Sequence, residues 1–545
     1  MSDSKILSAS ALMAAGTIVS RLSGYLRTLL LVAALGAFTH ADIFNLANTV
    51  PNMVYILVAG GVFNAVLVPQ LVRSMKNDED GGAAYANRII TLAGLFLAAV
   101  SVVLVLAAPQ VMSIFLDSEW DDPAMAAQRE SVNSFARYCL PQVFFYGMFV
   151  LVGQVLNARG RFGPMMWAPI ANNVISVSVL LIYLASFGKA SGEELYAGFS
   201  PGEEALLGLG STLGIAVQFG VLIPYLRLAG FRYRPRFDFR HTGLGHTMRL
   251  GAWTVLFVLA NQIAYTVVAR LASSGTIGAT DGTGYTVYSS TFLIMMVPHA
   301  IVTVSIATAL LPTLSQQAAD GELRQLGATL SGGLRSAMVL VIPFVMLITV
   351  VSRDVANLLF GWGAGAHSAN SFAPSMVLFA PGLLFFTVHY FMLRGFYALE
   401  RTRTAFFVQL VIAGVNIVMA VLLVSQANPS STAPALAMAY GCSYLAGAAV
   451  SYLTLRRALG TLETRVLVRF VVRMGLATTV GTLLAWALNL GLYEVGPDSA
   501  KWWSLLRGGL VGVVGLGVSI AAARAMRVTE VTSVLNTLSS RLRRS

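Results

Sequence analysis

The sequence predicts an all-α polytopic membrane protein with about fourteen transmembrane helices. Of its 545 residues, 56% are hydrophobic and only 11% are charged, and the mean hydropathy is +0.73. Soluble domains carry about 25% charged residues. Apolar runs of roughly 20 residues, the length that crosses a bilayer, recur along the whole chain between short polar turns. The net charge of +12 does not require a nucleic-acid partner, because loop lysines and arginines also set membrane topology.

Each apolar run ends where charged residues, glycine or proline gather, and these positions give the approximate span limits. The connections are short, so we expect no separate soluble domain. The predicted spans are 10–36, 43–72, 86–116, 134–157, 164–188, 204–228, 248–272, 285–314, 332–351, 374–398, 404–425, 433–455, 467–492 and 503–525.

The distribution of basic residues predicts the orientation in the membrane. With a cytoplasmic N-terminus, 27 of the 36 lysines and arginines fall on the cytoplasmic side, six on the opposite side and three inside spans. An excess of basic residues marks cytoplasmic loops. The loops on the opposite side are acidic instead, as at 117–122 and 193–194. We therefore expect both termini in the cytoplasm.

A weak internal repeat predicts two lobes. Arg161 follows Pro141 by twenty residues, and Arg401 follows Pro381 by the same twenty. Two six-helix lobes in one orientation would produce this, since six crossings return the chain to the same side; chance placement of prolines is the alternative. The expected division is an N-terminal lobe (1–230), a C-terminal lobe (231–460), two additional helices (461–530) and a basic tail (531–545).

Two arginines, Arg21 and Arg27, lie inside the first predicted span, and no acid on that helix can pair with them. A guanidinium within a bilayer is costly unless it faces a wet cavity or a partner. The simplest explanation is an internal cavity that binds an anion; the alternative is an ion pair with a carboxylate of another helix. The two arginines stand about 9 Å apart along an ideal helix but roughly 120° apart around it, so both face one cavity only if it is wide or the helix is distorted.

Several short motifs carry a family resemblance over the whole chain. The chain resembles the lipid II flippases, the MurJ/MviN family of the MOP exporter superfamily. The motifs are SRLSGYLR at 20–27, ADIF at 41–44, PN at 51–52, GVF at 61–63, VP at 68–69, RYCLP at 137–141 and ALLPTLS at 309–315.

The resemblance implies two six-helix lobes around a cationic central cavity for the pyrophosphate and sugars of lipid II. It also implies a groove at the last two helices for the polyprenyl tail. Arginine forks bind phosphate bidentately, so the helix-1 arginines suit a pyrophosphate of about two negative charges. The expected substrate-binding residues are Arg21, Arg27, Asp42, Asn52 and Arg270. The expected gating positions are the glycine and proline breaks at Gly24, Pro51, Gly60, Gly61 and Pro298.

The sequence also departs from the family pattern. Positions where many members carry charges read Thr28, Tyr55, Ile56 and Gly60 here, and the family's aspartate-arginine pair in helix 8 is replaced by Phe292 and Leu293. The cavity is therefore expected to be less charged than in such members, with Arg270 either compensating or serving as a loop charge.

No nucleotide-binding or metal-binding motif occurs, and the histidines, including His40, show no metal spacing. We expect a transporter without cofactor or metal, driven by membrane potential or an ion gradient, not an enzyme. The expected partners are lipid II or a similar polyprenyl-pyrophosphate saccharide, the phospholipid bilayer and the cell-wall synthesis machinery, and the expected location is the bacterial cytoplasmic membrane.

Three functions remain open at this point. The first is the inner-to-outer flipping of lipid II by alternating access. The second is a MOP-type flippase for another polyprenyl-linked saccharide, or a multidrug antiporter. An antiporter usually carries intramembrane acids, however, and the predicted spans hold almost none. The third is a membrane enzyme or scaffold of the wall machinery, although no clustered acids or metal site indicate an enzyme.

Overall fold

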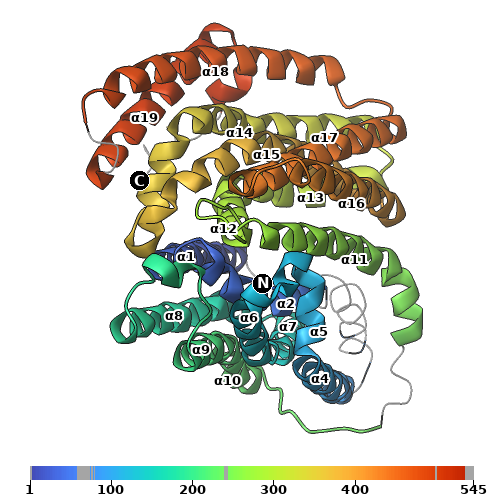
Figure 1. Ribbon diagram of the computed structural model, residues 1–545. Coiled ribbons are helices and arrows are strands. Elements are labelled where there is room, and N and C mark those ends of the chain that lie inside the picture. Colours follow the sequence, from blue (N-terminus) through green and yellow to red (C-terminus); the bar gives the residue numbers. More distant parts are fainter. Residues whose placement is uncertain are drawn as a thin grey trace. The chain divides into compact units, whose positions relative to one another are not determined.

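The structure is a computed structural model of residues 1–545. It describes residues 3–57, 82–238, 244–496 and 500–533 and the positions 71, 74, 78 and 80; of residues 3–15 and 244–251 it describes the backbone alone. Regular elements in these ranges are helical (Figure 1), and thirteen stretches among them are long and apolar enough to cross a membrane. These findings confirm the predicted all-α polytopic class. Of the predicted span 43–72, only the part up to residue 57 and residue 71 lie within the described ranges.

The chain divides into two compact units. Unit 1 comprises 1–278 with the short segments 284–286 and 363–365, and unit 2 comprises the remainder. The helix α11 (Leu244–Ser274) falls in unit 1. The two six-helix lobes with a boundary at residue 230 stay a prediction.

Unit 1 is a bundle in which α1 packs on α8, α8 on α9, α2 on α6, and α4 on α7. A buried apolar cluster between α4, α7 and α10 forms part of its core. Besides α11, its helices are α1 (Asp3–Leu35), α2 (Thr39–Ile56), α4 (Ala83–Leu106), α5 (Ala108–Phe115), α6 (Ala126–Cys139), α7 (Gln142–Ala158), α8 (Gly163–Ser186), α9 (Pro201–Gly220) and α10 (Leu222–Leu228), with short turns η2 (Ser118–Asp121), η3 (Pro123–Met125) and η4 (Gly192–Tyr196).

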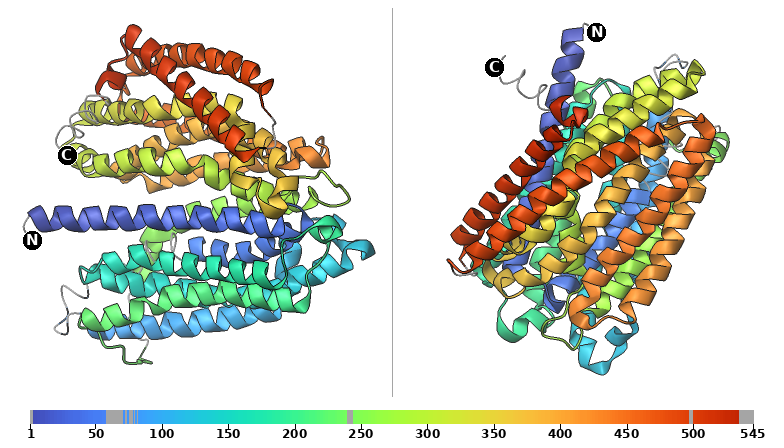
Figure 2. Two further views of the ribbon diagram at one scale, coloured as in Figure 1. Left: turned by 90° about the vertical axis from the view of Figure 1, so that its left-hand side faces the viewer. Right: turned by 90° about the horizontal axis from the view of Figure 1, so that it is seen from above.

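Unit 2 is a second bundle, built around α15, which packs against α14 and α17. The last two helices, α18 and α19, pair with each other and with α14 (Figure 2). Its elements are α12 (Tyr285–Met295, the first two residues of which belong to unit 1), η5 (His299–Thr303), α13 (Val304–Ala319), α14 (Leu323–Phe360), η6 (Gly363–His367, shared with unit 1), α15 (Ala369–Ala398), α16 (Thr402–Val424), η7 (Pro429–Ser431), α17 (Thr432–Leu459), α18 (Thr464–Tyr493) and α19 (Lys501–Ala525).

Several predicted spans are broken in the structure. The span expected over 86–116 is interrupted at Ala107, and that over 285–314 contains a π-helical turn directly after Pro298. Proline lacks an amide hydrogen and its ring crowds the preceding turn, so an α-helix does not continue undisturbed through it. Conversely, the span expected over 332–351 is part of the much longer helix α14.

The repeated segments seen in the sequence end in the same local structure. After α7, the Arg161 amide donates to the Leu156 carbonyl at 2.9 Å, and Gly160 has a φ of +74°. After α15, the Arg401 amide donates to the Phe396 carbonyl at 2.8 Å. Its neighbour Glu400 has a φ of +56°, a left-handed conformation that is uncommon for residues other than glycine. The helices that contain Leu226, Gln317 and Ala523 end in the same way, so this cap does not separate a repeat from chance, and the repeat stays a prediction.

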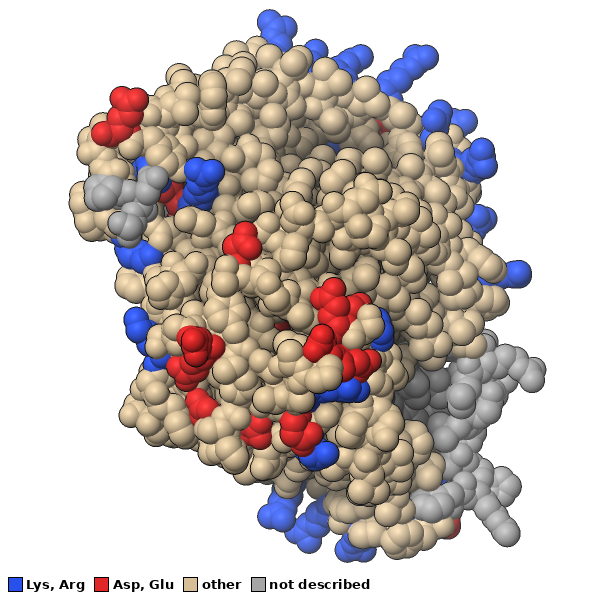
Figure 3. Space-filling view, viewed as in Figure 1, with Lys and Arg blue, Asp and Glu red and all other residues tan. Residues whose placement is uncertain are grey.

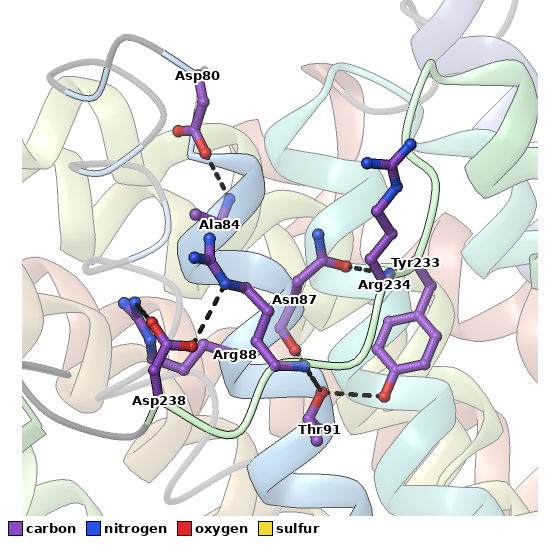
Figure 4. A network of polar contacts seen from close by, with 9 residues as sticks. Asp80, Ala84, Asn87, Arg88, Thr91, Tyr233, Arg234 and Asp238 are labelled. Carbon is purple, nitrogen blue, oxygen red and sulfur yellow. Dashed lines mark hydrogen bonds and ion pairs between the residues drawn. The ribbon is translucent and has the colours of Figure 1, made fainter.

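The basic connector after α10 lies along the first turns of α4 (Figure 4). The Arg88 guanidinium pairs with Asp238, and the Arg234 amide donates to Asn87 Oδ1 at 2.8 Å. The pairing with Arg88 lowers the pKa of the exposed Asp238 carboxyl. The connector is therefore held by polar contacts within unit 1.

Charged side chains are unevenly distributed over the surface. In the space-filling view of Figure 3, acidic side chains gather on the face towards the viewer, and most lysines and arginines stand at its edge. The short turns η2 and η4 of unit 1 are acidic and carry Glu119, Asp121, Glu193 and Glu194. The predicted topology places the acidic turns η2 and η4 on the side opposite to the cytoplasm, and this orientation stays a prediction.

Candidate functional site

The packing of α1 against α8 fixes how the helix-1 arginines are presented. Asn173 of α8 donates its amide to the Ser20 carbonyl at 2.9 Å and to Ser23 Oγ at 2.8 Å. A Cβ on Gly24 would lie 3.7 Å from the same amide. Small residues at this spacing form one face of the helix and allow close approach of its neighbour. One face of α1 is thus held on α8.

Among the residues that the structure describes, the two arginines have no carboxylate partner. Arg21 is exposed and Arg27 is half-buried. Neither guanidinium takes part in an ion pair or hydrogen bond within the ranges that the structure describes. The alternative explanation, a carboxylate of another helix, therefore finds no partner in those ranges.

Tyr146 of α7 lies within electrostatic range of Arg27, which the sequence does not predict. The Tyr146 ring packs on Tyr55 of α2, with ring centroids 4.7 Å apart. Neither phenol donates a hydrogen bond to another described residue. Phenolic hydroxyl groups can donate to anionic oxygens, so the pair offers two donors at the α2–α7 contact.

Tyr55 was noted in the sequence only as a departure from the family's arginine. No sequence signal links it to Tyr146, because the contact between α2 and α7 exists only in the folded bundle. The sequence offered one indication of a role for Tyr55, which is that an aromatic residue stands where many family members carry a charge.

Asn52 and Pro51 lie on α2 close to this pair. Asn52 is exposed, and Pro51 is buried inside the helix. One turn earlier, Asn48 accepts a hydrogen bond from Gln142 of α7 at 3.0 Å. The α2–α7 contact is therefore polar at Asn48 and aromatic at Tyr55. Asn52 lies between these two residues along α2.

Asp42 is fully buried, and its carboxylate accepts several hydrogen bonds within unit 1. Its oxygens accept the backbone amides of Tyr285 at 3.0 Å and Thr286 at 2.6 Å, and the Thr276 hydroxyl at 3.2 Å. Tyr285 and Thr286 are the first residues of α12. A carboxylate at a helix N-terminus satisfies amides that have no partner inside the helix. The structure thus places Asp42 in a capping contact.

Arg270 lies near the end of α11. Its guanidinium donates to the Ser113 carbonyl in α5 at 2.9 Å. A cation near a helix C-terminus compensates the partial negative charge of the last carbonyls. Within the described parts, no interaction joins Arg270 to Arg21 or Arg27.

The predicted gating positions differ in their surroundings. Gly24 faces Asn173, Pro51 is inside α2, and Pro298 precedes the π-helical turn η5. Gly60 and Gly61 lie outside the described residues. The role of all five in gating stays a prediction.

An acid inside a candidate span was also missed. The predicted ninth span ends at residue 351, but α14 continues to Phe360 and buries Asp354. Arg507 of α19 donates hydrogen bonds from Nε and Nη2 to the Asp354 carboxylate, and the shortest of them, from Nη2 to Oδ1, is 2.7 Å long. The acid is therefore neutralised by a cation and offers no free carboxylate for coupling to an ion.

The chain is similar to known lipid II flippases along most of its length. The model of the family described as "Lipid II flippase MurJ" matches residues 31–502. A relative from Vibrio cholerae, described as a probable lipid II flippase MurJ, is 26% identical over 538 residues, which cover 94% of each chain. A lipid II flippase MurJ from Burkholderia cenocepacia is 25% identical over 419 residues, which cover 75% of each chain.

Solved structures show the same fold. An inward closed conformation of a lipid II flippase MurJ has a TM-score of 0.71 at 15% identity, covering 95% of this chain and 99% of that chain. An inward-facing multidrug resistance MATE family transporter of the MOP superfamily has a TM-score of 0.64 at 14% identity, covering 82% of this chain and 96% of that chain. Together with the family match over most of its length, these similarities show that the chain is a membrane transporter that belongs to the lipid II flippase MurJ family.

Proposed function

We propose that this chain moves lipid II from the inner to the outer leaflet of a bacterial cytoplasmic membrane by alternating access. Membership of the family supports lipid II as the substrate. The excess of basic residues in the predicted cytoplasmic loops supports an orientation with both termini inside. The remaining question is which residues hold the anionic headgroup during the transfer.

The observation that carries the proposal is that Arg21 and Arg27 of α1 form no ion pair with any residue that the structure describes. A cation inside a membrane is costly when no counter-ion lies nearby. Such a residue is kept where an anionic ligand supplies the opposite charge. Arg21 and Arg27 bind the pyrophosphate through charge-assisted hydrogen bonds, each contributing about 1.5–3 kcal/mol. The phenols of Tyr55 and Tyr146 donate to the phosphate oxygens beside Arg27, and the exposed Asn52 contacts the headgroup.

Asp42 and Arg270 act in this scheme as positioning residues. The Asp42 carboxylate is occupied by the amides at the start of α12, and the Arg270 guanidinium donates to a carbonyl of α5. Their contribution to binding is therefore indirect.

A membrane potential, negative inside, can drive this cycle. It favours outward movement of an anionic headgroup by about 2.3 kcal/mol per charge per 100 mV. The same potential draws the empty cationic site back towards the cytoplasmic side. The chain itself then needs no nucleotide hydrolysis.

The test is complementation of bacterial cells that lack their own lipid II flippase, with membrane levels of each variant measured in parallel. Arg21→Ala and Arg27→Ala should abolish growth at normal expression. Arg21→Lys should be impaired less, because lysine keeps the charge but loses the planar fork. Arg129→Ala, which removes an exposed arginine paired with Asp121, is the matched control and should grow normally.

Normal growth of Arg21→Ala at normal expression would overturn the anionic-site argument. The substrate is tested separately by depleting this protein in its own host and locating the accumulated precursor. Lipid II on the inner face supports the proposal, whereas accumulation of another polyprenyl-linked saccharide assigns the chain to that substrate. The missing charges at Thr28, Tyr55 and Phe292 are the reason to measure both.

A further inference from the structure

A histidine and two glutamates from separate parts of unit 1 come together at the beginning of α2. One ligand atom of each of His40, Glu194 and Glu203 lies within 4.8 Å of the others. His40 is the second residue of α2, Glu194 belongs to η4, and Glu203 is in the first turn of α9. Their separation in the sequence explains why the spacing of residues gave no metal motif.

The His40 ring is held in one orientation. Its Nδ1 lies 3.0 Å from the Ala197 carbonyl, and its ring stacks on Phe199 with centroids 3.5 Å apart. A carbonyl only accepts, so Nδ1 carries the hydrogen and donates it. In the neutral ring, Nε2 then presents a bare lone pair, which is the tautomer that metal-binding histidines adopt.

The lone pair on Nε2 has no protein partner. His40 is 0% exposed, and Nε2 is buried without a hydrogen bond among the residues that the structure describes. A buried polar atom without a partner costs about 1–3 kcal/mol. One ring nitrogen of His40 lies within 4.8 Å of a carboxylate oxygen of each glutamate, and because Nδ1 donates to the Ala197 carbonyl, Nε2 is the nitrogen left to bind an ion there.

The carboxylates are positioned by contacts of their own. Glu203 accepts the Tyr183 hydroxyl at 2.9 Å and the amide and hydroxyl of Ser200 at 2.8 and 2.7 Å. Glu194 accepts the Ser191 amide at 3.2 Å. Outer contacts of this kind orient carboxylate ligands around metal ions.

The charge of the cluster is not balanced by protein. Neither Glu194 nor Glu203 forms an ion pair with lysine or arginine within the described ranges. Two carboxylates around a neutral imidazole leave about two negative charges, and Glu203 and His40 are buried. Two like charges at this separation repel unless a cation lies between them.

We propose that His40, Glu194 and Glu203 bind one divalent transition-metal ion, with Zn²⁺ as the best fit. One imidazole nitrogen and two carboxylate oxygens form a known kind of three-ligand zinc site, with bonds of about 2.0–2.2 Å and water in a fourth position. Mg²⁺ and Ca²⁺ fit less well, because they take oxygen ligands. The ion would join η4 and the first turn of α9 to the start of α2 and stabilise this end of unit 1.

The test uses the full-length purified protein in detergent, stripped of metal with a chelator and titrated with Zn²⁺ against a chromogenic competitor. We expect one tight Zn²⁺ per chain, an upward shift of Tm that the chelator reverses, and visible absorption bands when Co²⁺ replaces Zn²⁺. Mg²⁺ should reproduce none of these.

His40→Gln and Glu194→Gln should weaken Zn²⁺ binding by about 100-fold or more. Loss of a residue that only hydrogen-bonds to a metal ligand weakens binding by about 10- to 100-fold. Glu194→Gln keeps an oxygen that accepts the Ser191 amide, so its fold should be preserved. The matched controls are Glu193→Gln, an exposed glutamate next to the cluster, and His367→Ala, an exposed histidine outside it; both should bind Zn²⁺ normally.

Absence of stoichiometric Zn²⁺ in the wild-type protein would overturn the proposal, as would equal binding by Glu194→Gln. Tighter binding of Mg²⁺ than of Zn²⁺ would show that His40 is not a ligand, and this result would also overturn the proposal. None of these measurements depends on lipid transport, so the result is independent of the proposed function.

Discussion

Arg507 of α19 and Asp354 of α14 form a buried ion pair with two parallel hydrogen bonds. The Nη2–Oδ1 distance is 2.7 Å, the Nε–Oδ2 distance is 3.2 Å, and the two side chains are 2% and 3% exposed. The guanidinium carbon also lies 3.7 Å from the centre of the Tyr493 ring. An arginine that would be costly alone in an apolar bundle is thus satisfied by an acid and an aromatic face.

Removing one partner of this pair should destabilise the protein strongly. Asp354→Asn and Arg507→Ala should each lower the free energy of unfolding by about 3–5 kcal/mol, because the remaining group is left buried without its partner. Thermal unfolding in detergent measures the effect as a fall in Tm. Replacing both partners with apolar residues, Asp354→Leu with Arg507→Met, should restore much of the loss.

The control for the ion pair is Arg129→Ala, which breaks an exposed pair with Asp121 at 2.6 Å. Exposed pairs contribute about 0–1 kcal/mol, so its Tm should change little. An unchanged Tm in Asp354→Asn would mean that the buried pair does not form.

Gly284 should not tolerate a side chain. A Cβ at this position would collide with Asp42 Oδ2, the oxygen that accepts the Tyr285 amide. Gly284→Ala should therefore lower the Tm and the amount of folded protein in the membrane, as measured by fluorescence-detected size exclusion. Gly163→Ala, where a Cβ meets nothing within 4 Å, is the control and should be neutral. If both variants behave like wild type, Asp42 does not make this contact.

The tyrosine pair should matter for transport and not for folding. Tyr55→Phe and Tyr146→Phe each remove one hydroxyl donor of about 0.5–1.5 kcal/mol, which corresponds to a roughly two- to tenfold loss of flipping rate. The ring packing is kept, so Tm should not change. The measurement is flipping of a fluorescent lipid II analogue in proteoliposomes. Tyr225→Phe, which alters an exposed phenol on α10, is the comparison and should leave the rate unchanged.

The orientation can be read by cysteine labelling from outside intact cells. The native Cys139 and Cys442 are first replaced by alanine. Cysteines at the exposed Ser118 and Ser191 should react with an impermeant reagent, and cysteines at the exposed Arg232 and Asp320 should react after the cells are opened. Labelling of Arg232→Cys or Asp320→Cys in intact cells would reverse the assigned topology.

The sequence by itself determined the class of the protein. Apolar runs of membrane-spanning length and the low charge content fix an all-helical membrane protein, because a bilayer leaves the backbone few other ways to satisfy its polar groups. Arg21 and Arg27 could be singled out for the same reason: a charge inside an apolar helix stands out without knowledge of its neighbours.

Only the tertiary structure decided which distant residues share a site. Tyr146 and Tyr55, Asp354 and Arg507, and His40 with Glu203 come from helices that the sequence does not pair. Such contacts depend on helix packing, rotation and the exact helix ends, and these follow from the fit of many small side-chain surfaces. Asp354 was missed because the helix continues beyond the apolar run, where Arg507 compensates its charge.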